Sequence, residues 1–232
     1  MTTIKQVKET VQPLLARHAD LALVGRYLIL TPVRHFVRGV LIDASGDRNI
    51  FVPATSVCLT FDGDATQGIG WGDHLIYLSF EEADPDLLYK RRNDPRFGKW
   101  DTRYPENIEL MLRFIEASLE PLREMTTFEQ MMAFAQRPEN NLTPFEFMYY
   151  ARFLLAAAIG DFETARHIIE KREGMRLSLE AHYPSLCPAL IAEDRAEVAK
   201  CLHELEAKTI KNLKLSKYWE PTPFPLERKA TQ

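Results

Sequence analysis

Few side chains in this sequence stand at spacings that chemistry requires, and the clearest pair is Asp73 beside His74. An adjacent carboxylate and imidazole suit acid–base or metal chemistry. However, no second His or Cys stands at ligand spacing, and neighbouring residues of a strand point to opposite faces. The sequence also lacks a Gly-rich phosphate loop before a helix, a Gly-x-Ser-x-Gly elbow and a His-Glu-x-x-His motif. We therefore expect no metal, no cofactor and no catalytic residue, and we favour a non-enzymatic protein over an enzyme.

A second candidate is the segment 89–100, which interleaves five Lys or Arg with Tyr89, Phe97 and Trp100. Cations and aromatic rings together bind phosphates and stack on bases. Nearby acids roughly cancel the local charge, whereas nucleic-acid affinity needs net positive charge. These acids are Glu81, Glu82, Asp84, Asp86, Asp94 and Asp101. A nucleic-acid-binding accessory protein that uses residues 89–100 is therefore an alternative and not our leading hypothesis.

Arg34 and Arg38 form a third candidate. If residues 33–43 are a strand, both guanidinium groups project from one face and His35 projects from the other. Two Arg on one face can clamp a carboxylate. A solvated sheet face explains the same pattern, and we prefer it because antiparallel sheets commonly have one wet face. The alternative is an enzyme or small-ligand protein with a pocket between sheet and helices, lined by Arg34, Arg38 and His74.

The tail after Lys217 places Trp219 and Phe224 among three prolines, at positions 221, 223 and 225. Such a segment favours an extended, polyproline-like conformation. Aromatic side chains on a pre-extended segment lose little entropy on docking. We expect the tail to dock on its own helices, and an outward-facing ligand motif is the alternative.

The composition is that of a globular protein whose 232 residues suit one large domain or two small ones. A net charge of -4 gives no global reason to expect nucleic-acid binding. Cys58, Cys187 and Cys201 each lie in an apolar run, which predicts buried free thiols. No signal peptide is visible, and no apolar run approaches the length that spans a bilayer. We therefore expect a cytoplasmic protein without a membrane partner.

Residues 1–136 predict an α+β domain. Apolar spacing predicts a helix over 3–18, with a kink or a break at Pro13. Segments rich in Val, Ile, Leu and aromatic residues then predict an N-terminal antiparallel sheet of three to four strands flanked by helices. These segments are 23–30, 33–43, 50–61 and 74–80.

Two helices complete the predicted N-terminal domain. The first begins at Pro105, runs to Leu119 and is broken by Pro121. The second begins with a capping box at Thr127 and Gln130 and runs to about Gln136. The N-terminal helix and the helix after 105 are the expected covers of one sheet face.

Residues 137–232 predict antiparallel helical hairpins that end in the Pro-rich tail. Thr143-Pro144-Phe145-Glu146 has the residues of a helix start. Gly160 allows the left-handed turn that ends this helix, Asp161 caps a second helix, and Gly174 closes that one. The pattern recurs 33 residues later, where Asp194 precedes another apolar stripe. This spacing suits helix-turn-helix repeats.

The turn Gly-Asp-Phe-Glu-Thr-Ala at 160–165 resembles the inter-helix turn of a tetratricopeptide repeat, and the resemblance covers residues 143–174. The typical Trp-x-x-Leu-Gly start is absent, so a generic helical hairpin explains the segment equally well. Either reading implies a helical scaffold.

The order of elements over residues 1–135 resembles small α+β domains of bacterial toxin-immunity proteins. Tyr27–Asp43, with Arg38-Gly39, and Phe51–Phe61 carry this resemblance. It implies a non-enzymatic binder, and no individual residue role transfers with it. An inhibitor of this type would occlude the active site of a toxin and set acidic patches against a basic enzyme.

We therefore predict a cytoplasmic, non-enzymatic protein that binds a protein partner, with an immunity-type inhibitor as the most specific form. The first candidate contacts are the acids Asp62, Asp64, Asp73, Glu81 and Glu82. Arg34, Arg38, Trp100 and Trp219 are the others.

Overall fold

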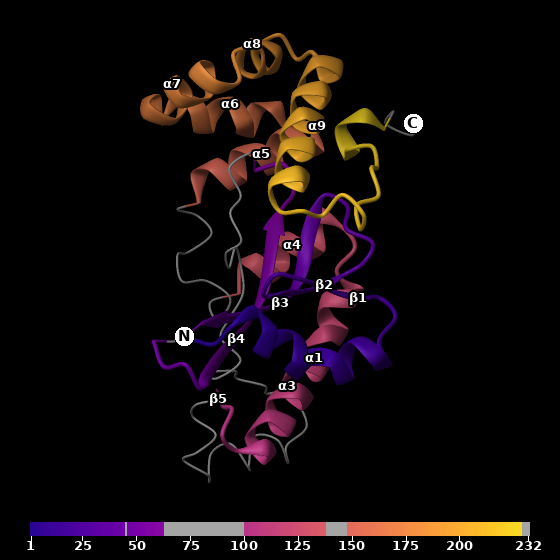
Figure 1. Cartoon of the computed structure of the whole chain (residues 1–232). Coiled ribbons are helices and arrows are strands. Elements are labelled where there is room, and N and C mark those ends of the chain that lie inside the picture. The colour runs from indigo at the N-terminus through magenta and orange to yellow at the C-terminus, as the bar shows by residue number, and fades with distance from the viewer. Residues whose placement is uncertain (45, 63–99, 138–147, 229–232) are drawn as a thin grey trace. The chain divides into compact units, whose positions relative to one another are not determined.

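The computed structural model describes residues 1–44, 46–62, 100–137 and 148–228, and Figure 1 shows them as an α+β protein. The chain divides into two compact units. We call Met1–Val33, Val37–Cys58 and Gln67–Leu142 the sheet unit, and Arg34–Phe36, Leu59–Thr66 and Thr143–Gln232 the hairpin unit. We predicted one boundary, at 136/137, whereas here two short segments from the N-terminal part also belong to the hairpin unit.

A five-stranded antiparallel sheet forms the centre of the sheet unit, with the strands in sequence order. The strands are β1 (Leu21–Val24), β2 (Tyr27–Leu30), β3 (Phe36–Ala44), β4 (Ile50–Leu59) and β5 (Trp100–Asp101). Leu21 pairs with Leu30, Tyr27 with Leu41 and Phe51 with Trp100. Every link from β1 to β4 is short, and this allows sequential strands to pair as antiparallel neighbours.

The α+β prediction is confirmed, but the sheet has more strands than the three to four predicted. Residues 23–30, which we took as one strand, split into β1 and β2 at a two-residue turn. Gly25 makes this turn possible, because its φ of 63° lies in the left-handed region that glycine adopts without strain. β5 lies outside the four predicted strand segments, and the predicted strand 74–80 lies outside the described residues.

Helix α1 (Ile4–Arg17) and helix α3 (Pro105–Glu124) pack against each other. α1 also packs against β1, and α3 packs against β5. This bears out the two covers expected for the sheet. Both helices run through a proline, at Pro13 and Pro121, so the predicted break at Pro121 and a division of α1 into two pieces are wrong. Each proline removes a single backbone donor. The apolar residues on either side, such as Leu119 and Leu122, are fully buried and hold the helix together across that gap.

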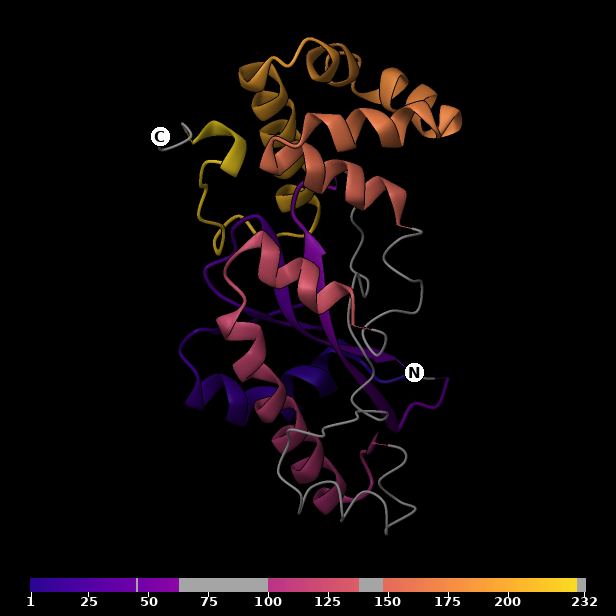
Figure 2. The same ribbon diagram turned by 180° about the vertical axis from the view of Figure 1, so that it is seen from behind.

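Helix α4 (Phe128–Ala135) begins at the predicted capping box. The Gln130 amide donates to Thr127 Oγ1 over 3.3 Å, and the Thr127 amide donates to Gln130 Oε1 over 3.1 Å. These bonds satisfy two donors that a helix start otherwise leaves unpaired. Figure 2, seen from behind, shows α3 and α4 on one side of the strands.

The hairpin unit contains helices α5 (Tyr149–Ile159), α6 (Phe162–Glu170), α7 (Glu173–His182), α8 (Leu186–Ile191) and α9 (Arg195–Asn212) and the short 3-10 helix η4 (Pro225–Glu227). α5 is apolar all round and buries residues 153–158, since α6, α9 and η4 all pack on it. It begins at Tyr149, after a non-helical Met148, and the predicted start at 143–146 lies outside the described residues. Gly174 lies inside α7 and does not close the preceding helix as predicted.

The predicted 33-residue repeat is present as a repeated turn. Gly160 (φ 83°) and Glu193 (φ 55°) are both left-handed and follow α5 and α8. The next amide in each copy, that of Asp161 or Asp194, donates to a carbonyl five residues back over 2.9 Å. The same two aspartates then cap α6 and α9 through their side chains. One hairpin turn is therefore built twice, at the predicted spacing.

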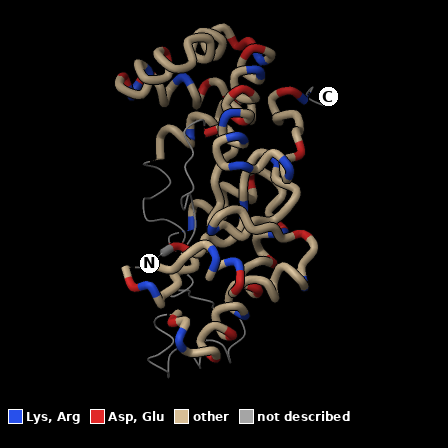
Figure 3. The backbone as a smooth tube through the Cα atoms, viewed as in Figure 1, with Lys and Arg blue, Asp and Glu red and all other residues tan. Residues whose placement is uncertain are grey.

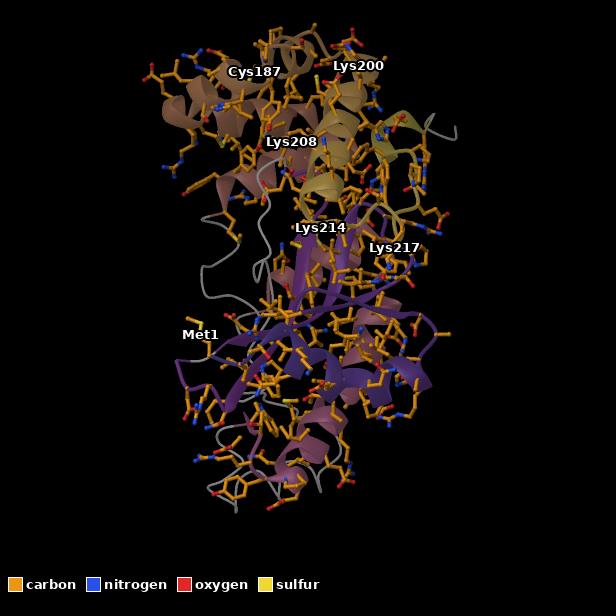
Figure 4. All side chains as sticks on the ribbon, viewed as in Figure 1. Met1, Cys187, Lys200, Lys208, Lys214 and Lys217 are labelled. Carbon is orange, nitrogen blue, oxygen red and sulfur yellow. The ribbon has the colours of Figure 1, made fainter. Side chains whose placement is uncertain are left out.

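All three cysteines are free. Cys187 and Cys201 are buried thiols as predicted, and burial raises the pKa of both. Cys58, in the sheet unit, is half-buried, so the prediction that it is buried is wrong. Four lysines step by three residues along the end of α9 and beyond, and all four are exposed: Lys208, Lys211, Lys214 and Lys217. Figure 4 labels three of them. Within the described residues, no helix has both the length and the apolar character needed to cross a bilayer.

Gly39 is the tightest position in the sheet, and a side chain there should be damaging. A Cβ on Gly39 would lie 2.1 Å from the backbone oxygen of Leu28, which cannot rotate away. We expect Gly39→Ala to lower the free energy of unfolding by more than about 2 kcal/mol, since overpacking is that costly even where neighbours can shift. Urea denaturation measures this. The control is Gly46→Ala, because nothing lies within 4 Å of that position. Similar stability of the two variants would contradict the proposed close contact.

A bidentate ion pair should make the sheet unit sensitive to acid. Arg123 donates to both oxygens of Asp20, over 2.8 Å and 3.1 Å, and these bonds lower the pKa of Asp20. A lowered pKa stabilises the fold above the unfolded pKa, and this contribution disappears as the pH falls through the folded pKa. The pair is partly exposed, so we expect Asp20→Asn to lower the free energy of unfolding by at most about 1 kcal/mol at pH 7 and by clearly less at pH 3. Urea midpoints at both pH values test this, and an equal loss at both would contradict it.

Candidate functional site

The hairpin unit contains a fully buried carboxylate, that of Glu206 on α9. Its Oε1 accepts a hydrogen bond from Thr60 Oγ1 at 2.7 Å and another from His35 Nδ1 at 3.1 Å. Within the described residues, its Oε2 has no hydrogen-bond partner and lies 3.6 Å from His203 Nδ1. A buried polar group is costly unless it is hydrogen-bonded, so these donors stabilise the Glu206 side chain inside the unit.

Both histidines also reach the C-terminal tail. His203 Nε2 lies 2.9 Å from Glu227 Oε2, and that oxygen also accepts from the backbone amide of Phe224. His35 Nε2 lies 3.1 Å from Thr222 Oγ1 and 3.3 Å from the Pro223 carbonyl. The Thr222 hydroxyl can donate to this nitrogen, so both ring nitrogens of His35 have a hydrogen-bond partner. We call Thr60, His35, Glu206, His203 and Glu227 the Glu206 clasp.

The clasp surrounds the buried ring of Phe224. This ring stacks on His35 with centroids 4.2 Å apart, meets Phe61 edge-on at 5.1 Å and lies 4.7 Å from His203. These are favourable separations for ring pairs. The prediction that the tail docks on its own helices is therefore confirmed.

A pocket of about 810 Å³ opens beside the clasp, between the first half of α9 and the tail. We call it the α9–tail pocket. Buried Ala199 and Leu226 contribute its apolar wall, and its cations are Arg195, Lys200 and Arg228. His203 and Glu227 of the clasp also line it. Its size matches that of a small-molecule or peptide side-chain site.

Two members of the clasp lie out of reach of a ligand. Thr60 and Glu206 are fully buried, and the hydrogen bonds of Glu206 go to groups of the same unit. A nucleophile or base must reach a substrate atom at hydrogen-bond distance. In the described part of the chain, no group of three or more His, Cys, Asp or Glu has the arrangement of a metal site. The clasp therefore positions the tail, and the open surface beside it is the α9–tail pocket.

The predicted pairing of Arg34 with Arg38 on one strand face is wrong. β3 begins at Phe36, so Arg34 and His35 lie before it, and Arg34 and Arg38 belong to different units. The Thr60 amide donates a hydrogen bond to the His35 carbonyl over 3.0 Å, and this bond holds residues 34–35 beside the clasp. Arg34 is exposed and forms a loose ion pair with Glu220 at 3.3 Å, whereas Arg38 is half-buried in β3.

The aromatic candidates occupy different environments. Trp100 is fully buried in the sheet unit and packs against Phe114, with centroids 5.5 Å apart, so it is a core residue. Trp219 is half-buried, and in the described part of the chain its indole nitrogen has no hydrogen-bond partner.

Among the acidic candidates, the structure places Asp62 alone; Asp64, Asp73, Glu81 and Glu82 lie outside the described residues, as do His74 and residues 89–99. The Asp62 carbonyl accepts from Tyr150 Oη over 3.2 Å. Asp62 also lines a second pocket, of about 520 Å³, where the guanidinium of Arg172 lies 3.6 Å from the centre of the Tyr149 ring.

Sequence reasoning missed the clasp, because it treated the histidines as isolated. One signal was available. Val198 and Leu202 recur at four residues on the buried face of α9, and Glu206 continues the same series. A charged residue within an apolar stripe predicts a buried charge that needs partners. The identity of those partners was not readable, since His35 and Glu206 are 171 positions apart.

Comparison with known proteins finds no match for this chain among family models, curated proteins or solved structures.

Truncating the buried carboxylate should destabilise the hairpin unit. Glu206→Ala removes the acceptor of His35 Nδ1 and leaves Thr60 Oγ1 with the Arg34 carbonyl, 3.0 Å away, and breaking a buried pair costs about 3–5 kcal/mol. We expect a loss of about 3 kcal/mol in urea denaturation, together with faster amide exchange at Phe224. The control is Glu204→Ala, an exposed position on the same helix. Unchanged exchange at Phe224 would contradict the role of the clasp in holding the tail.

Proposed function

We propose that this protein is a non-enzymatic, protein-binding protein and that its partner contacts the hairpin unit. One observation carries the proposal. Helix α7 has ten residues and buries a single one, Leu179. Its Leu177 side chain is 53% exposed, and Ile191 at the end of α8 is 67% exposed. A helix held by so little internal burial gains stability when a partner covers its apolar side chains.

The construction of the unit supports the same proposal. Two hairpins with the same turn are linked by α7, and α6, α7 and α8 pack on one another. Stacked helical hairpins are scaffolds whose outer helices offer extended binding surfaces. Figure 3 shows Lys and Arg interspersed with Asp and Glu along the hairpin helices, so no single sign of charge dominates them. Apolar contact and local charge pairs would both contribute to such an interface.

An immunity-type inhibitor of a bacterial toxin is the specific form that we propose. The resemblance of residues 1–135 to such domains motivates it. We place the protein in the cytoplasm as part of this proposal. Its three free thiols agree with a reducing compartment.

Affinity capture with matched surface variants tests the proposal. Full-length protein on beads should retain a partner from lysate of the native organism, and a double variant, Leu177→Glu with Ile191→Glu, should retain at least about tenfold less, as expected for central interface residues. Ile4→Glu is the control, because Ile4 is 57% exposed in the sheet unit. Identifying the partner as a toxin would support the immunity-type form. Equal retention by all three proteins, or no protein retained above empty beads, would overturn the proposal.

A further inference from the structure

The α9–tail pocket has a chemistry that the binding proposal does not use. It combines an apolar wall with cations from two elements, Arg195 and Lys200 on α9 and Arg228 in the tail. Lys200, labelled in Figure 4, lies in the first half of α9. Two carboxylates lie close by, those of Glu197 and Glu227. The net charge that a ligand meets in the pocket depends on how far these carboxylates are already paired.

Glu227 is paired by groups of the hairpin unit. Its Oε2 accepts from the Phe224 amide over 2.6 Å and lies 2.9 Å from His203 Nε2. Glu197 is likewise paired, since the Lys200 ammonium donates to both of its oxygens over 2.9 Å and 3.1 Å. Paired carboxylates repel an incoming anion less than free ones, because their partners offset their charge. Arg195 and Arg228 are the cations of the pocket that have no carboxylate within ion-pair distance among the described residues.

Arg195 is oriented by its surroundings. Its Nη1 donates to the Leu226 carbonyl over 3.0 Å, and its guanidinium carbon lies 5.7 Å from the centre of the Phe162 ring. A guanidinium carries five N–H donors in a fixed plane, so one bond to a carbonyl leaves most of them for a ligand. Arg228, one residue beyond η4, is exposed and adds a second positive charge to the lining. Holding Arg195 in place in advance lowers the entropy cost of binding.

We propose that the α9–tail pocket binds a carboxylate that has an apolar neighbour, supplied by an acidic segment of the protein partner. Arg195 contacts the carboxylate, Arg228 adds charge attraction, and Ala199 with Leu226 contacts the apolar neighbour. A volume of about 810 Å³ accommodates two or three side chains. The proposal rests on the proposed function, because it names the chemistry of the partner.

Peptide binding to the full-length protein tests this site directly. The probe is a fluorescein-labelled hexapeptide that alternates Glu and Leu, and fluorescence anisotropy at low salt measures its Kd. We expect Arg195→Ala to raise the Kd at least about tenfold, the effect of losing a charge-assisted hydrogen bond. Arg228→Ala should raise it about threefold or more, and higher salt should weaken binding because exposed charges are screened. Glu227→Gln should lower the Kd, since it removes a negative charge from the lining.

Two controls keep the result interpretable. Arg166→Ala removes an arginine of the same unit that pairs with Glu193 outside the pocket, and it should leave the Kd unchanged. Arg228 has no side-chain contact that folding requires among the described residues, so its variant is informative even if Arg195→Ala disturbs the tail. A Gln-Leu peptide should not bind, and acetate should compete better than inorganic phosphate if the planar carboxylate is the recognised group.

Three results would overturn the proposal: no binding of the acidic peptide at low salt, equal binding of the Gln-Leu peptide, or a Kd unchanged by both Arg195→Ala and Arg228→Ala. Competition by phosphate alone would also overturn it. These outcomes differ from failure of the proposed function. The beads could retain a partner that depends on Leu177 and Ile191 while the same protein does not bind the acidic peptide. That result would support the proposed function and rule out this carboxylate site.

Discussion

The buried carboxylate of Glu206 is the constraint on which the hairpin unit depends. It collects one donor from each of two short segments, Thr60 and His35, that are distant in sequence from α9. Those segments, Arg34–Phe36 and Leu59–Thr66, belong to the hairpin unit although the chain around them belongs to the sheet unit. A buried carboxyl group with no hydrogen-bond donor is costly, so the fold is more stable when these donors reach it. The polar cluster therefore specifies which parts of the chain meet.

The same cluster connects the core of the unit to its surface. His35 and His203 each use one ring nitrogen toward Glu206 and the other toward the tail. Phe224 is then enclosed by their rings and by Phe61. Because the tail is fixed in this way, Leu226 and Arg228 form one wall of a pocket whose other wall is α9. The pocket between α9 and the tail is thus a consequence of the buried polar cluster.

Several local signals were accurate. The capping box at Thr127 and Gln130, the cap at Asp161 and the 33-residue repeat of the hairpin turn all appear as predicted. Local reasoning failed where packing overrode it. Pro121 is inside α3 because flanking Leu119 and Leu122 are buried, and Gly25 divides a segment that looked like one strand. Burial of several side chains outweighs one lost backbone hydrogen bond.

The sequence by itself determined the α+β class, the two covering helices of the sheet, the hairpin turns and the docking of the Pro-rich tail. Each of these depends on residues within a few turns of one another, or on the demand that apolar stripes be buried. The tertiary structure alone decided that His35, Thr60, His203 and Glu227 gather at Glu206, that Trp100 is a core residue, and that Arg195 faces a pocket beside the tail. No local pattern encodes a contact between residues 171 positions apart, because the partner of a buried charge is chosen by the path of the whole chain.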